Sequence, residues 1–201
     1  MMILAGRALK VLVLTAVLGG VLGFASFKYL PQKYIASGSL LVSRKAQSSG
    51  AGAFSYEGYY AQQTARGYAE TLIGFLESTD ARKKALERLG VATDEVNLRQ
   101  AKRHVRAKKS APQVVTLEVR RYDAYKAEDY WEALVAEVLE LSTDFNNRFG
   151  DPLISVNLVE GSPVVYPAYR NVYINTLVGV GLGLTFGVFV IFMKEYVQTS
   201  H

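Results

Sequence analysis

The sequence predicts an α/β domain carried between two hydrophobic helices. The longest apolar runs of this 201-residue chain lie at its two ends, and each is long enough to cross a bilayer. Between them, segments with a helical spacing of apolar residues follow segments in which every second residue is apolar. We therefore expect transmembrane helices over 11–29 and 172–193. Between them, over 30–171, we expect an α/β (α+β) domain with helices packed on one face of a small mixed sheet.

The composition argues against an enzyme. The chain has no cysteine and only two histidines, so disulfides, thiolate catalysis and zinc–thiolate sites are excluded. The carboxylate pairs Glu128 with Asp129 and Glu57 with Glu70 resemble acid–base pairs, but nothing distinguishes them from helix-surface carboxylates, and spacing alone does not make a glycosidase. No P-loop pattern occurs, so we expect no fused kinase. We also expect no catalytic residue, no cofactor and no metal.

The first apolar run, residues 11–27, contains no charge and approaches the ~20 residues that span a bilayer. Arg7 and Lys10 precede it, and Lys28 follows it. A signal peptide has the same charge pattern, and Gly23 to Ala25 offers a weak cleavage site, so this alternative stays open. The matching helix at the other end of the chain favours a retained anchor.

The second run, residues 172–193, is interrupted only by Asn175 and the hydroxyl of a threonine. Gly179, Gly183 and Gly187 recur every four residues and fall along one side of a helix. Small residues in such a row let another helix approach closely, so we expect helix packing there. The alternative is the ordinary glycine usage of membrane helices.

Two spans place both termini on the same side of a membrane. Arg7, Lys10 and Lys194 flank the ends of the spans nearest the termini, and the positive-inside bias favours the cytoplasm for them. Lys28 and Lys33 on the other flank of the first span weaken this bias. We expect residues 1–10 and 194–201 in the cytoplasm and the domain outside it. An interfacial belt before the second span is predicted from Tyr166, Tyr169 and Tyr173.

The first half of the domain reads as one strand and three helices. A strand is predicted over 34–42 and a loop over 47–53, followed by a helix from about Tyr60 that ends near Glu77. Thr79 or Asp80 is the expected N-cap of a second helix, which Gly90 ends. Thr93 is the expected N-cap of a third, short helix.

The second half contains a predicted hairpin, a long helix and a final strand. Residues 113–121 alternate cleanly, and 104–108 is the expected partner across a turn at 110–112. Asp123 is the predicted N-cap of a helix that 146–152 ends. A strand follows over 153–160, and Pro163 and Pro167 return the chain to the membrane in extended form. The apolar face of the long helix consists of Ala127, Trp131, Leu134, Val135, Val138, Leu141 and Phe145.

Four stretches carry a resemblance to a known family. They are 30–36 after the first span, 115–119 with Asp123 and Ala127, 156–160 with Pro163 and Pro167, and Asn171 before the glycine-rich second span. In order and spacing they resemble the polysaccharide co-polymerases, also called the Wzz or chain-length determinant family. Two features depart from the family: it often has three prolines where this chain has two, and Gly161 stands where an alanine is common.

The resemblance implies a homo-oligomeric ring in the bacterial inner membrane that acts on a cell-surface polysaccharide such as O-antigen, capsule or exopolysaccharide. The implied partners are a polysaccharide polymerase or the growing glycan. Many members carry an extended helical arm, for which this chain has little room, so it looks closest to the short, adaptor-like members. Those members work with a cytoplasmic tyrosine kinase. A kinase-activating adaptor is therefore one alternative function, and a membrane-anchored sensor or binding domain is another.

Two groups of side chains are candidate glycan or head-group contacts. Tyr56, Tyr59, Tyr60 and Tyr68 cluster on the first long helix and could stack on sugars, although core packing explains them equally well. A basic run can bind an anionic glycan or lipid head groups, although such runs are usually solvated surface. We expect no nucleic acid, because the domain lies outside the cytoplasm. The cations of the basic run are Arg99, Lys102, Arg103, Arg106, Lys108 and Lys109, and His104 lies among them in the sequence.

Overall fold

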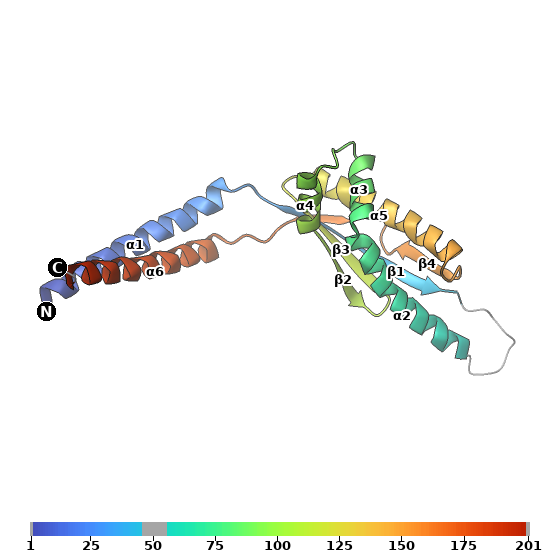
Figure 1. Cartoon of the computed structure of the whole chain (residues 1–201), viewed down its shortest axis with the longest axis horizontal. Coiled ribbons are helices and arrows are strands. Elements are labelled where there is room, and N and C mark those ends of the chain that lie inside the picture. The colour runs from blue at the N-terminus through green and yellow to red at the C-terminus, as the bar shows by residue number, and fades with distance from the viewer. Residues whose placement is uncertain (1, 46–55, 200–201) are drawn as a thin grey trace. The chain divides into compact units, whose positions relative to one another are not determined.

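The computed structural model describes residues 2–45 and 56–199, and the predicted loop at 47–53 lies outside them. The chain divides into two compact units, Met1–Pro31 with Tyr169–His201 and Gln32–Ala168. The first is helical and the second is a mixed α/β domain, and each is described by itself (Figure 1).

The helical unit consists of α1 (Met2–Tyr29) and α6 (Val172–Thr199). Within them, Leu9–Tyr29 and Val172–Lys194 are long and apolar enough to cross a membrane. Both segments form continuous helices because they contain no proline and because a helix satisfies every backbone hydrogen-bonding group internally.

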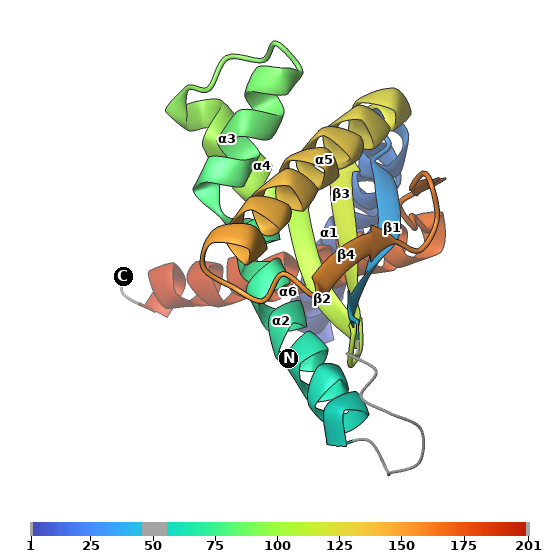
Figure 2. The ribbon, with the colours of Figure 1, turned by 90° about the vertical axis from the view of Figure 1, so that its right-hand side faces the viewer.

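The α/β domain has five strands and four helices in its described residues. The strands are β1 (Tyr34–Arg44), β2 (Val105–Ala111), β3 (Val114–Arg121), β4 (Ile154–Leu158) and β5 (Val164–Pro167). The helices are α2 (Tyr56–Glu77), α3 (Thr79–Arg88), α4 (Glu95–His104) and α5 (Ala124–Arg148). As predicted, helices and strands form one domain, and α2 and α5 lie across one face of its sheet (Figure 2).

The sheet is antiparallel, and the prediction of a mixed sheet was wrong. Its strand order is β2-β3-β1-β4, and β5 also pairs with β1. Every observed pair is antiparallel. β3 and β4 do run in the same direction, but they lie on opposite sides of β1. The helical crossover between them therefore brings no parallel pair into contact.

The predicted extended return after Pro163 is the strand β5. It pairs with the first half of β1, where Ile35 lies opposite Tyr166 and Tyr34 opposite Pro167. Pro167 is tolerated because it ends an edge strand, where its missing N–H breaks no interior ladder. Beyond it, the Ala168 N–H donates to the Lys33 carbonyl at 2.8 Å, and the Gln32 side-chain amide donates to the Ala168 carbonyl at 2.9 Å. The domain therefore begins and ends at the same end of its sheet.

The N-caps of two helices differ from the prediction. The N-cap of α3 is Ser78, not Thr79 or Asp80, and its hydroxyl accepts from the Ala81 N–H at 3.1 Å. The N-cap of α4 is Asp94, not Thr93. In both cases the capping residue has extended backbone angles, which aim its oxygen at the N–H three residues later. The predicted Asp123 cap of α5 is confirmed.

The hairpin also differs from the prediction in its bounds. His104 is the last residue of α4, so β2 begins at Val105, and β2 continues to Ala111. The pairing of β2 with β3 shifts between Lys109 and Ala111 and continues to Ala111. The turn therefore consists of residues 112–113 and is shorter than predicted.

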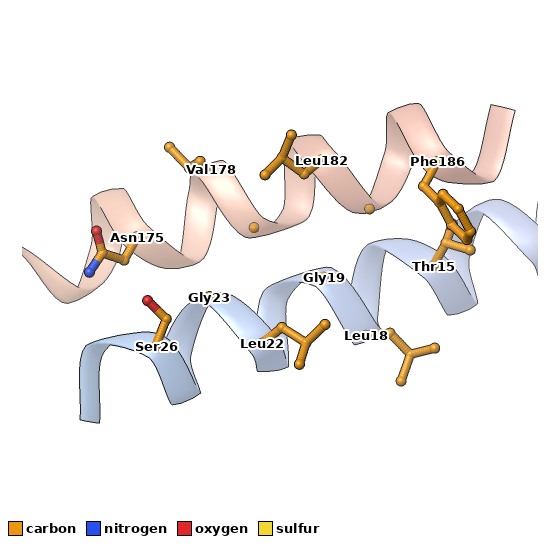
Figure 3. A pocket seen from close by; sticks show the side chains of 12 residues that line it. Thr15, Leu18, Gly19, Leu22, Gly23, Ser26, Asn175, Val178, Leu182 and Phe186 are labelled. Carbon is orange, nitrogen blue, oxygen red and sulfur yellow. The ribbon is translucent and has the colours of Figure 1, made fainter. Parts of the chain in front are cut away.

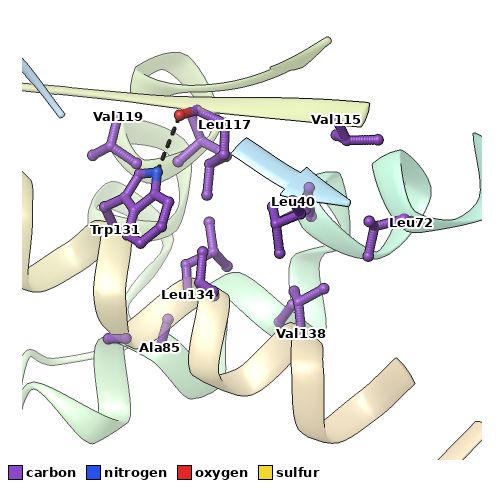
Figure 4. Packing of buried hydrophobic residues seen from close by; sticks show 14 of the residues in the cluster. Leu40, Leu72, Ala85, Val115, Leu117, Val119, Trp131, Leu134 and Val138 are labelled. Atoms are coloured by element: carbon purple, nitrogen blue, oxygen red, sulfur yellow. Dashed lines mark hydrogen bonds between the residues drawn. The ribbon is translucent and has the colours of Figure 1, made fainter. Parts of the chain in front are cut away.

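The core lies between the sheet and α2, α3 and α5. Trp131 is 1 % exposed, and its indole N–H donates to the Leu117 carbonyl at 3.0 Å (Figure 4). On the predicted apolar face of α5, Leu141 and Phe145 are only half-buried. The neighbouring Ser142 is fully buried instead, because its hydroxyl pairs with the Tyr68 hydroxyl at 2.9 Å.

Gly38 in β1 makes room for Trp131. A Cβ at Gly38 would overlap the six-membered ring of Trp131, whose Cη2 would lie 3.0 Å away. We predict that Gly38→Ala destabilises the domain by about 1–3 kcal/mol, because the buried ring cannot retreat. Unfolding of the full chain in detergent, followed by the fluorescence of Trp131, the only tryptophan, measures this.

Gly74→Ala in α2 is the matched control. A Cβ at Gly74 meets nothing within 4 Å, so this change should be neutral or stabilise the helix by about 0.5–1 kcal/mol. Equal stability of the two variants would show that the ring does not need the space over Gly38.

Candidate functional site

The basic run does not form a single surface. Arg99, Lys102 and Arg103 lie on α4, and the other three cations lie on β2. Lys109 shares the helix-covered side of β2 with Val105 and Ala107, and its amine is 3.1 Å from a carboxylate oxygen of Glu70 on α2. Residues of β2 alternate between the two faces of the sheet. The run is therefore divided among α4, the helix-covered face of the sheet and the opposite face.

Arg106 and Lys108 belong to the opposite face of the sheet, where Glu118 forms an ion pair with Lys108. Lys108 donates to the Glu118 carboxylate at 2.6 Å, and Arg120 donates to it at 3.5 Å. The hydrogen bond from Lys108 is the main cause of a lowered pKa of Glu118, so this acid is charged at neutral pH. Arg99 is likewise paired, with Glu95 at 2.9 Å. Within the described residues, Lys102, Arg103 and Arg106 have no ion pair.

His104 adds no charge to the run at neutral pH. Burial is the main cause of its lowered pKa, and the positive charges of Arg121, Lys33, Arg103 and Arg120 lower it further. These cations meet where β1 and α4 adjoin the end of β3. The result is a concentration of positive charge at the end of the sheet where the domain begins and ends.

The glycine row of α6 packs against α1 of the same chain. A Cβ at Gly179 would collide with the Gly19 carbonyl oxygen, and a Cβ at Gly183 would collide with the Thr15 carbonyl oxygen. A Cβ at Gly187 would collide with the hydroxyl of Thr15. The backbones of the two helices are therefore in direct contact at Gly179 and Gly183, which only glycine permits there.

The complementary row on α1 is a feature that sequence analysis missed. Thr15, Gly19 and Gly23 are also spaced four residues apart, and Gly23 faces the Asn175 carbonyl. This spacing is the signal in the sequence that reveals the row, although Gly23 is also part of the weak cleavage site. Apart from Gly187, the two rows line one groove between the helices, with Ser26 and Asn175 at one end of it (Figure 3).

Arg170 closes the same end of the helix pair. Its guanidinium donates to the Leu30 carbonyl at 2.7 Å and to the Ser26 carbonyl at 2.5 Å, and it lies 4.9 Å from the centre of the Phe27 ring. The last carbonyls of a helix lack partners within the helix, and a cation there is favoured by the helix dipole. Arg170 therefore ties the end of α1 to the start of α6.

The other predicted site residues are spread over both units. Pro163 is buried directly before β5, and Pro167 is its last residue. Tyr68 is in the core, whereas Tyr59 and Tyr60 are exposed and stack edge to face at 6.0 Å between ring centres. Tyr166 lies in β5, and Tyr169 and Tyr173 are exposed in the helical unit. The described residues contain no group of three or more metal-binding side chains.

The chain matches no protein-family model, and no curated protein matches it. Function is therefore inferred from the geometry of the two units, together with the local sequence resemblance.

The glycine contact predicts opposite effects for two neighbouring substitutions. Gly183→Leu should separate α1 from α6, because its side chain meets the backbone of α1. Gly181→Leu should leave them paired, because a Cβ at Gly181 meets nothing within 4 Å. A cysteine pair at Gly20 and Val180 reports the contact, since a Cβ at Gly20 would be 3.0 Å from Val180 Cγ2.

The measurement is protection from a maleimide–polyethylene glycol reagent after mild oxidation. The chain has no cysteine of its own, so only the introduced pair can react. The pair should be protected in the Gly181→Leu background and modified in the Gly183→Leu background. Equal protection in both would refute close packing through Gly183.

Proposed function

We propose that this chain is a non-enzymatic membrane scaffold that oligomerises to control the length or export of a cell-surface polysaccharide. The observation that carries the proposal is the direct, glycine-mediated packing of two helices that are each long and apolar enough to cross a membrane. In lipid there is no hydrophobic drive between helices, so close backbone packing is the means by which such a pair stays together.

The α/β domain is suited to a two-helix anchor. Its first and last residues are hydrogen-bonded neighbours, so both connections to the apolar helices start from one place. With both spans inserted, the domain lies on one side of the membrane and both termini lie on the other. The charges beside the spans favour the cytoplasm for the termini and the outside of a bacterial inner membrane for the domain.

The polysaccharide part of the proposal is supported by the resemblance to the Wzz family. The stretches that carry it include 30–36, which leads into β1, and Pro163 to Asn171, which includes β5. These are the two connections between the domain and the helices. If this chain and the Wzz family connect their domains to membrane helices in the same way, their sequences should be similar at these two connections.

Assembly would use the domain faces that its own helices leave uncovered. The sheet face opposite α2 and α5 carries hydroxyl groups that bond to each other, with Ser39 3.0 Å from Thr116 and Ser43 2.9 Å from Ser155. It also carries the charged trio Lys108, Glu118 and Arg120. A ring of copies would present such a face repeatedly to a polymerase or a growing glycan.

Deleting the gene should change the length distribution or the amount of the host's surface polysaccharide, as seen on a gel of extracted polymer. Re-expressed wild type and the Gly181→Leu control should restore the distribution, and Gly183→Leu should not. Light scattering of the detergent-extracted protein should give a mass of several chains. Unchanged polymer after deletion, or a monomeric protein, would refute the proposal.

A further inference from the structure

A pocket of about 480 Å³ lies among α3, α4 and α5, away from the sheet face described above. Leu86 and Leu89 form an apolar wall, and Gln100 and Lys126 add polar groups. Arg121, the last residue of β3, and Tyr130 of α5 line it as well. This volume is within the range that small ligands occupy.

Two arginines interact with Tyr130. The Arg121 guanidinium carbon is 4.5 Å from the centre of the ring. Arg82 of α3 is only 5 % exposed and interacts electrostatically with the same tyrosine. Burial is the main cause of the lowered pKa of each arginine, and burial raises the pKa of Tyr130. The two guanidinium groups remain charged, and the phenol keeps its proton as a hydrogen-bond donor.

This cluster lacks the partners that buried polar groups normally have. Within the described part of the chain, the guanidinium groups of Arg82 and Arg121 form no hydrogen bond and no ion pair. The Arg82 Nε and the Tyr130 hydroxyl are buried without a partner. Buried charges and donors are costly when unpaired, and they are usually satisfied by an ion pair or a bound group. Two acids are nearby: Glu77 acts on Arg82, and Asp129 lines the pocket.

We propose that this pocket binds a phosphate group, with the Arg121 guanidinium and the Tyr130 hydroxyl as donors, Lys126 at its rim and Arg82 as a buried positive charge that acts on Tyr130. An anion would supply the acceptor that the buried Tyr130 hydroxyl lacks, and the planar guanidinium of Arg121 suits phosphate oxygens.

The position of the pocket favours phosphate over other anions. Arg121 pairs with Tyr34 at the first position of β1, a few residues after the end of α1. Phosphate esters are the abundant anions at a membrane surface, as lipid head groups or lipid-linked intermediates. The choice of phosphate rests on the proposed membrane attachment. The evidence from the unpaired buried donors is independent of it.

Calorimetric titration of the full chain with inorganic phosphate, in a neutral detergent at constant ionic strength, tests the site. Wild type should bind phosphate, and Arg121→Gln should weaken binding by at least about tenfold, as the loss of a charged donor implies. Arg120→Gln is the matched control, because it removes the same charge one residue earlier, on the other face of the sheet. It should bind phosphate as wild type does.

Tyr130→Phe keeps the test decisive if Arg121→Gln fails to fold. It retains the ring that Arg121 covers and removes only the unpaired hydroxyl, so the fold should persist while phosphate affinity falls. Absence of phosphate binding by wild type, or unchanged affinity in Tyr130→Phe and Arg121→Gln, would overturn the site. Phosphate binding by a chain whose deletion leaves the polymer unchanged would contradict the proposed function alone.

Nanodiscs distinguish the two sources of phosphate. If lipid head groups fill the pocket, discs containing phosphatidylglycerol should suppress the binding of added phosphate compared with the protein in phosphate-free neutral detergent. Equal binding in discs and in detergent would assign the pocket to a soluble phosphate ester. In either case, Arg121→Gln should remove the binding that wild type shows.

Discussion

The pairing of β1 with β5 is the constraint on which the rest of the structure depends. β1 pairs with β3, β4 and β5, so one strand organises the whole sheet. The two residues before β1 also hold the last residue of the domain, through the bonds of Gln32 and Lys33 to Ala168. Without this closure, the connections to α1 and α6 would leave the domain at unrelated places. With it, a single domain can be mounted on a pair of helices that contact each other along two glycine rows.

The two units are stabilised by different physics. The domain buries large apolar side chains, and the absence of a side chain at Gly38 is what lets Trp131 reach the sheet. The helical unit exposes most of its apolar side chains, and its helices meet through backbone atoms at Gly19, Gly179 and Gly183. Such a helix pair suits lipid, where exposed leucines and valines cost nothing and close packing provides the attraction.

Local patterns in the sequence predicted most elements but not their assembly. Alternation in 113–121 and the face of Ala127, Trp131 and Leu134 identified β3 and α5, because burial on one face leaves a period in the sequence. Strand direction leaves no such mark, so the sheet was wrongly expected to be mixed. The glycine row on α6 was found, whereas its partner on α1 was overlooked. The Arg82–Arg121–Tyr130 cluster could not be predicted, because its residues come from α3, β3 and α5 and meet only in the folded domain.

The side of the membrane on which the domain lies is the central claim, and single-cysteine labelling tests it most directly. The native chain has no cysteine, so Tyr125→Cys in the domain, where the side chain is 78 % exposed, and Lys194→Cys beside α6 are clean reporters. In spheroplasts, a membrane-impermeant maleimide should label the cysteine at position 125 at once and the one at position 194 only after the membrane is permeabilised. Labelling of position 194 from outside, with position 125 protected, would contradict the account.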